Sequence, residues 1–207
     1  MMGIDGCGKT TQITMARQFF DHHGISVVES KAYSRTIKPL IDPWLKDWNE
    51  LAINFLFQAL YTQQRIEAIQ ASREGRVVLA DRWDESFLVY HSLHGPLSRD
   101  RTFREALNNY AFDSVLPDLG FMLTVDPVIG KQRTWERDRY DILDQRPDKR
   151  PIEYFAQIQD EYVKLAKRRG YILVPTEASA DDVHTVVVSY IKQLLPAFGK
   201  ILTKVEE

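Results

Sequence analysis

Gly3-Ile4-Asp5-Gly6-Cys7-Gly8-Lys9-Thr10 decides the fold of this 207-residue chain, because it matches the phosphate-binding pattern GxxxxGK(S/T) at every fixed position. Its glycines let the backbone turn so that several N–H groups point into one concavity. Lys9 adds a mobile cation, and the helix starting here directs its positive end toward the same phosphates. The loop therefore predicts a nucleoside triphosphate site formed by Gly3, Asp5, Gly6, Cys7, Gly8, Lys9, Thr10 and Thr11.

Apolar, largely β-branched runs alternate with helical segments along the rest of the chain. We expect strands at 25–29, 76–81, 119–125 and 171–174, and long helices at 9–23, 51–74, 103–112, 151–169 and 181–195. Strands separated by helices pair in parallel through right-handed crossovers, so this order predicts an α/β fold with a doubly wound parallel sheet. Ligands of such sheets bind at the carboxyl ends of strands, where Lys31, Asp81-Arg82 and Asp126 stand.

The phosphate loop usually follows a buried strand, but only Met1 and Met2 precede Gly3. Such a strand usually has about five to eight residues, here expected to be apolar and β-branched. We therefore expect the first strand to be missing from this chain and the natural protein to begin upstream.

The composition is that of an ordinary globular domain, with 44% apolar and 27% charged residues. A net charge of −2 gives no reason to expect a nucleic-acid polymer as partner. A single cysteine excludes an intramolecular disulfide and a cysteine-based zinc site, and no apolar run approaches the length of a membrane span. We expect one soluble, cytoplasmic domain over residues 1–207.

Asp81 and Arg82 close the second apolar strand. A carboxylate there can reach the shell of a Mg²⁺ ion held by the Thr10 hydroxyl, and Arg82 could clamp a phosphoryl group. Alternatively, Asp81 caps the following helix and Arg82 is a surface residue. Because the phosphate loop is present, we favour Thr10 and Asp81 as metal ligands and Arg82 as a catalytic residue beside Lys9.

In combination, these motifs resemble the thymidylate kinases, a family of nucleoside monophosphate kinases with the P-loop NTPase fold. The similarity rests on residues 3–12, Asp81-Arg82-Trp83 followed by Ser86, Pro117-Asp118-Leu119 before a strand, and Arg139-Tyr140-Asp141 before Tyr154-Phe155. It spans nearly the whole chain in the same order. The resemblance implies transfer of the γ-phosphate of ATP to dTMP, with Mg²⁺ as cofactor, to give dTDP.

The resemblance also implies an acceptor site drawn from several segments. Asp5 would face the 3′-hydroxyl of the sugar, Tyr61 would stack on the base, and Arg65, one helical turn later, would bond its edge. From spacing alone, that pair fits a core tyrosine and a solvated arginine equally well. The expected acceptor-binding residues are Asp5, Lys31, Arg35, Tyr61, Arg65, Arg82, Ser86, Tyr90 and Tyr140.

Two positions depart from the family pattern. An arginine of the family grips the acceptor phosphate where this chain offers only Lys31 or Arg35, and a lysine cannot make the same bidentate contact. Trp83 replaces the usual tyrosine or histidine. These departures leave two alternatives open: a kinase for another pyrimidine nucleotide or a deoxynucleoside, and a nucleotide-binding protein without turnover.

Residues 133–150 form an arginine-rich segment that we expect to act as a lid within the domain. The variable positions of the phosphate loop carry no cation, a pattern similar to the family branch whose catalytic arginine lies in the lid. We expect that role for Arg137 or Arg139, while others among Arg133, Arg146 and Arg150 fit a solvated helix paired with aspartates.

The segment 51–61 is apolar at nine of its eleven positions, all but Asn54 and Gln58. This is too many for one buried stripe, so the helix is either central in the core or also packs on a partner. The family forms homodimers through helices, and we therefore expect a homodimer.

Overall fold

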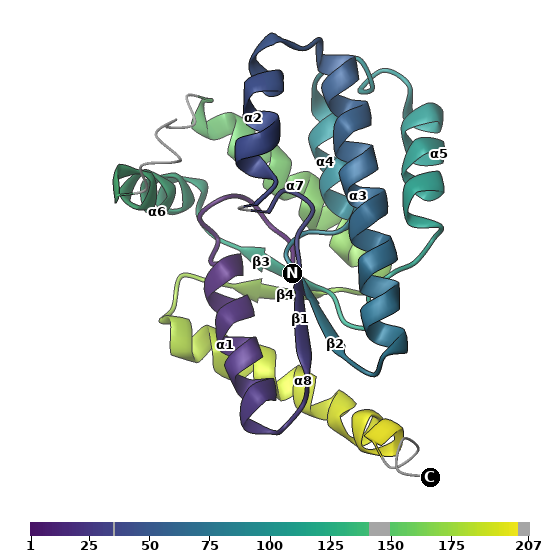
Figure 1. The fold of residues 1–207 in the computed structure, drawn as a ribbon. Coiled ribbons are helices and arrows are strands. Elements are labelled where there is room, and N and C mark those ends of the chain that lie inside the picture. Colours follow the sequence, from purple (N-terminus) through teal and green to yellow (C-terminus); the bar gives the residue numbers. More distant parts are fainter. Residues whose placement is uncertain (35, 141–149, 203–207) are drawn as a thin grey trace. The chain divides into compact units, whose positions relative to one another are not determined.

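The computed structural model describes residues 1–34, 36–140 and 150–202. The chain divides into two compact units (Figure 1). The first joins Met1–Gly24 to Leu119–Glu207, and the second is the intervening Ile25–Asp118. The single domain expected over the whole chain stays a prediction.

The first unit is a parallel strand pair covered by helices. Its strands pair in register from Phe121↔Ile172 to Thr124↔Pro175, and helix α7 packs on both. Helices α1 and α8 lie side by side. The elements of this unit are α1 (Lys9–His22), β3 (Phe121–Thr124), α6 (Pro127–Tyr140), α7 (Ile152–Arg169), β4 (Ile172–Pro175) and α8 (Ala180–Leu202).

The second unit is also built on a parallel strand pair, with Val27↔Val77 at one end of the register and Ser30↔Ala80 at the other. Helix α3 packs against both strands and against α4 and α5. The elements of this unit are β1 (Val27–Ser30), α2 (Lys38–Asp47), α3 (Glu50–Arg73), β2 (Val77–Ala80), α4 (Asp84–Leu93) and α5 (Arg101–Phe112).

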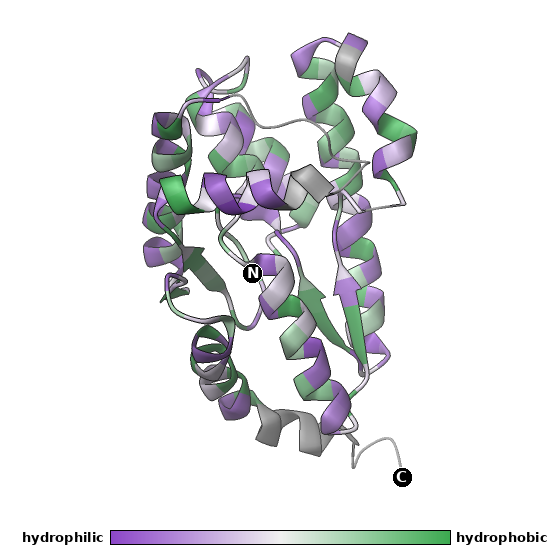
Figure 2. Cartoon of the chain, turned by 90° about the vertical axis from the view of Figure 1, so that its left-hand side faces the viewer, coloured by the Kyte–Doolittle hydropathy of each residue, from purple (hydrophilic) through white to green (hydrophobic). Residues whose placement is uncertain are grey.

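The hydropathy of the sequence explains these elements. Figure 2 shows the strands mostly in the green of apolar residues, whereas the helices alternate between green and purple. The first three residues of β3 are buried, as expected of a strand covered on both faces. None of the helices in the described part of the chain has the length and apolar character that crossing a membrane requires.

The predicted strands and helices are confirmed to within two residues at their ends, except that α8 continues to Leu202, beyond the predicted end at residue 195. The sheet differs from the single sheet expected. The described residues form two separate two-stranded sheets, one in each unit. Ahead of the phosphate loop, Met2 makes one parallel bridge to Met122, donating its N–H to the Phe121 carbonyl at 2.9 Å. Met2 therefore adds a single bridge to the β3–β4 pair, and the first strand expected upstream stays a prediction.

Candidate active site

The phosphate loop takes its shape from left-handed glycines. The φ angles of Gly6 and Gly8 are 81° and 89°, a region that other residues rarely adopt. Gly8 stands at the N-cap of α1 without a side-chain cap, so the backbone forms the helix start. Thr10 and Thr11 are exposed on the first turn, where the positive end of the helix dipole attracts anions.

Gly6 is also fixed by a close contact within the first unit. A Cβ atom at this position would lie 1.9 Å from the carbonyl oxygen of Gly130 in α6. A Cβ at Gly130 would in turn lie 3.1 Å from the Asp5 carbonyl. The loop therefore packs backbone to backbone against α6, and no side chain fits at Gly6.

The Lys9 ammonium group lies inside the loop. It donates hydrogen bonds to the carbonyl oxygens of Ile4 at 2.8 Å and Gly3 at 3.1 Å, and Asp5 Oδ1 lies 3.9 Å away. Cys7 is fully buried, with its Sγ 3.7 Å from the ammonium nitrogen. The loop thus brings the positive charge of Lys9 and the N-terminus of α1 to the same place, and both attract phosphate groups.

Six of the residues predicted from the sequence lie in the second unit around the end of β2. We call them the strand-end cluster: Lys31, Tyr61, Asp81, Arg82, Ser86 and Tyr90. The register that pairs Ser30 with Ala80 places Lys31 beside Asp81, and the ammonium nitrogen lies 2.6 Å from Asp81 Oδ2. The Asp81 side chain is 9% exposed and that of Lys31 is 45% exposed.

Arg82 has a left-handed backbone with φ of 68°, which is uncommon outside glycine; residues held in sparsely populated backbone regions cluster at functional sites. Its carbonyl accepts a hydrogen bond from Gln64 Nε2 of α3 at 3.2 Å. Its guanidinium carbon lies 5.4 Å from the centre of the Tyr90 ring. This conformation directs Arg82 toward a tyrosine that the sequence assigned to the same site.

Several charged residues in and around the strand-end cluster act on the Tyr61 hydroxyl. Burial raises the pKa of Tyr61 to about 12; the Arg82 charge opposes this rise and the Glu85 and Asp81 charges add to it. A side-chain hydrogen bond with Ser86 also lowers this pKa. Tyr61 is therefore a neutral phenol at physiological pH, and its ring packs 5.7 Å from that of Phe112.

The sequence did not predict a role for Glu85, and it marked Trp83 only as a departure from the family pattern. Glu85 is only 1% exposed and close enough to act on Tyr61, yet it carries no motif that marks it. The only sequence signal was an acidic residue in the first turn of α4. Trp83 donates its indole N–H to the Val115 carbonyl at 2.9 Å and packs in an apolar cluster with Phe112, so its departure from the family pattern fills the core.

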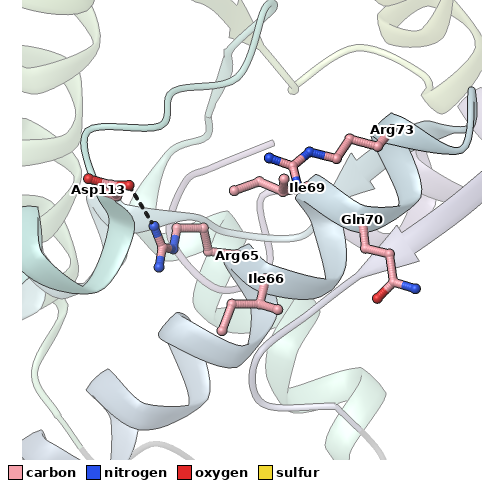
Figure 3. Close-up of a pocket in the computed structure, with 6 residues that line it drawn as sticks. All are labelled: Arg65, Ile66, Ile69, Gln70, Arg73 and Asp113. Carbon is pink, nitrogen blue, oxygen red and sulfur yellow. Dashed lines mark ion pairs between the residues drawn. The ribbon is translucent and has the colours of Figure 1, made fainter.

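In the part of the chain that the structure describes, Arg65 is largely buried and its ion pair is with Asp113 rather than a contact with Tyr61. Its Nη1 lies 3.2 Å from Asp113 Oδ2, and its side chain is 16% exposed. It lines an open pocket of about 500 Å³ (Figure 3). The pocket residues are Arg65, Ile66, Ile69, Gln70, Arg73 and Asp113.

The described arginines of the expected lid have structural partners. Arg133 donates to the Thr176 carbonyl at 3.1 Å, and Arg150 donates to the Tyr154 hydroxyl at 2.6 Å with its guanidinium over the same ring. Asp126, at the end of β3, accepts from the Val128 N–H and thus caps α6. The side chains of Arg137, Arg139 and Tyr140, together with Arg35 and Arg146, lie outside the described residues.

Comparison with known proteins identifies related sequences and folds. A family model described as thymidylate kinase matches residues 2–187. The chain is 29% identical over 200 residues to the thymidylate kinase of Tropheryma whipplei (strain Twist), covering 93% of this chain and 94% of that protein. It is 26% identical over 196 residues to that of Geobacillus sp. (strain WCH70), covering 90% and 91%. The crystal structure of thymidylate kinase from Ehrlichia chaffeensis superposes with a TM-score of 0.66 at 19% identity, over 91% of this chain and 95% of that one.

Proposed function

The chain belongs to the thymidylate kinase family, and we propose that it transfers the γ-phosphate of ATP to dTMP through its phosphate loop and strand-end cluster. It is an ATP-dependent phosphotransferase that forms ADP and dTDP. One observation carries the assignment of residues: Arg82, directly after β2, has a left-handed backbone, and its carbonyl accepts a hydrogen bond from Gln64 of α3.

The phosphate loop holds the donor nucleotide. Backbone N–H groups and the start of α1 bind its phosphates, and Lys9 moves from the carbonyls of Gly3 and Ile4 to the outer phosphates. Phosphoryl transfer involves little covalent chemistry by the protein, so this positioning and charge are the main contribution.

The strand-end cluster holds the acceptor. Tyr61 stacks on the base as a neutral ring, while Ser86 and Tyr90 line the sugar and Arg82 bonds the moving phosphoryl group. Lys31 binds the acceptor phosphate, together with Arg35. The roles of Asp5 at the sugar hydroxyl, of Arg65 at the base edge and of Tyr140 follow from the family resemblance.

Thr10 and Asp81 would hold Mg²⁺. A hydroxyl and a nearly buried carboxylate are hard oxygen ligands, and Mg²⁺ in kinases takes only one or two such protein groups, with water and substrate phosphates completing the shell. When bound there, the ion would neutralise charge on the phosphates.

An arginine of the lid completes the charge around the transferred group, as in the lid-arginine branch of the family. We assign it to Arg137 or Arg139, because Arg133 and Arg150 are engaged with Thr176 and Tyr154. The expected gain from such an arginine is at least about 10³-fold in turnover.

Helix α3 supports the proposal of a homodimer. Its polar residues Asn54 and Gln58 are buried, whereas Leu51, Phe55 and Ile66 are 39%, 47% and 48% exposed. An apolar stripe turned outward is suited to a second copy of the chain. Phe55→Glu should convert the dimer to monomer in sedimentation velocity, and Gln63→Glu, at an exposed polar position of α3, should not.

The substrate assignment is tested by ADP release with Mg-ATP and dTMP, dUMP, dCMP, dGMP or thymidine as acceptor. We expect dTMP to give the highest kcat/KM. A higher value with another acceptor would replace dTMP, and no release with any of them would make this a nucleotide-binding protein without turnover.

We place the enzyme in the cytoplasm, where its single cysteine stays reduced.

A further inference from the structure

Lys31 and Asp81 have different expected partners, yet in the structure they bind each other. Lys31 is assigned to the acceptor phosphate and Asp81 to Mg²⁺, while the Lys31 ammonium lies 2.6 Å from Asp81 Oδ2. The β1–β2 register explains the contact, because the two side chains follow directly on the paired residues Ser30 and Ala80. The ion pair therefore occupies two groups that catalysis needs for other purposes.

We propose that this ion pair is a latch: Asp81 holds Lys31 away from the acceptor phosphate until Mg²⁺ takes the carboxylate and Lys31 is released. The proposal rests on the proposed function, since it assumes that dTMP is the acceptor. Its consequence is that metal binding and acceptor binding favour each other through one lysine.

Charge and mobility support the latch. A lysine carries a compact charge on a flexible stem, so its ammonium group can swing between two anions. With the Lys31 side chain 45% exposed and that of Asp81 9% exposed, the lysine is the partner that can move. A Mg²⁺ ion on the Asp81 carboxylate would repel the Lys31 ammonium group bound to the same carboxylate.

Linkage makes the effect reciprocal. If the metal raises the affinity for dTMP by releasing Lys31, dTMP must raise the affinity for the metal by the same factor. An exposed ion pair is worth little, and the desolvation of a nearly buried carboxylate offsets much of what its pair gains. We therefore expect a coupling of about threefold to tenfold, near the lower end of the usual range.

A double-mutant cycle read by calorimetric titration of dTMP tests the latch without turnover. The proteins are the wild type, Lys31→Ala, Asp81→Asn and the double variant, each with and without Mg²⁺ and a non-hydrolysable ATP analogue. Without Mg²⁺, Asp81→Asn should bind dTMP about threefold to tenfold more tightly than the wild type. With Lys31→Ala already present, Asp81→Asn should add nothing, and Mg²⁺ should no longer tighten dTMP binding.

Three outcomes overturn the latch, two of which also say what Asp81 does instead. Weaker dTMP binding by Asp81→Asn would mean that Asp81 positions Lys31 for the phosphate, and equal tightening in the Lys31→Ala background would mean simple repulsion between Asp81 and dTMP. Lys164→Ala, which removes an exposed pair with Glu161, serves as the matched control and should change nothing. If the wild type binds dTMP but the cycle shows no coupling, the latch alone fails; if it neither binds nor phosphorylates dTMP, the proposed function fails with it.

Discussion

The phosphate loop occupies eight consecutive residues of the first unit, whereas the strand-end cluster gathers its residues from β2, α3, α4 and the end of β1 in the second. In the proposed function, the loop acts through backbone groups and one lysine. The cluster would act through side chains, some of which are already paired with one another, as Lys31 is with Asp81. A contiguous backbone site can be recognised from the sequence alone, but a site assembled from paired side chains needs the fold to show which groups face each other.

Gly6→Ala gives the largest expected effect, because the loop depends on its backbone. The new Cβ would clash with the Gly130 carbonyl, whereas the same change at Gly24, where φ is 69° and nothing lies within 4 Å, adds only left-handed strain. We expect Gly6→Ala to lower the free energy of unfolding by about 3 kcal/mol or more and Gly24→Ala by about 1 kcal/mol. Urea unfolding measures both, and equal losses would show that packing against α6 does not define the loop.

Arg82→Ala tests whether the cluster acts through one side chain. Turnover should fall about 10²-fold or more, equivalent to about 2.7 kcal/mol, with much less change in ATP affinity, because the charge of Arg82 matters most as charge develops in the transition state. Arg76→Ala is the matched control, since Arg76 precedes the same strand and pairs with Glu74. Steady-state kinetics with normal turnover in Arg82→Ala would remove this residue from the mechanism.

The second unit should also be the more sensitive to acid. Burial and, to a smaller extent, the Arg104 charge lower the pKa of His91 to about 4. Between pH 6.5 and about 4, the His91 ring binds a proton in the unfolded chain but not in the native protein. The contribution of neutral His91 to the free energy of unfolding is therefore fully present above pH 6.5 and is lost as the pH falls through this window. The loss is about 2 kcal/mol, after allowing for partial exposure of the ring.

Thermal melts between pH 7 and pH 4 check this effect, and His91→Gln should flatten the profile. His184 in the first unit provides the comparison: burial lowers its pKa as well, but Asp181 opposes the shift and the ring is more exposed. His184→Asn should therefore change the profile less. A larger change from His184→Asn would show that the first unit, and not the second, is the more sensitive to acid.

Gln58→Met gives the smallest effect and examines the inner face of α3. Both amide atoms of Gln58 are buried, and among the described residues neither has a hydrogen-bond partner. An apolar side chain of similar shape should raise the free energy of unfolding by about 1 kcal/mol. Gln63→Met, at an exposed position that pairs with Glu67, should stay within about 0.5 kcal/mol of the wild type. A loss of stability in Gln58→Met would show that this amide is satisfied by a partner such as bound water.

Local patterns predicted the strands, the helices and the phosphate loop, because each depends on near neighbours in the sequence. The pattern could not reveal that Asn54 and Gln58 face inward while Phe55 faces out, since apolar residues surround them on the helix. Nor could it find Glu85, the Lys31–Asp81 pair or the Arg65–Asp113 pair, which arise from contacts between distant segments. For Tyr61, spacing fits a core residue and an acceptor-site residue equally well, and only the family resemblance favours the acceptor site.

The central claim, that both regions serve one phosphoryl transfer, is tested most directly by following the transferred group. The wild-type protein is incubated with Mg²⁺, dTMP and ATP labelled with ¹⁸O in the γ-phosphate. The products are then separated, and mass spectrometry measures the amount of each product and its ¹⁸O content. We predict that the labelled phosphoryl group appears in dTDP in amounts equal to the ADP formed. Label found only in inorganic phosphate, with dTMP unchanged, would contradict the account.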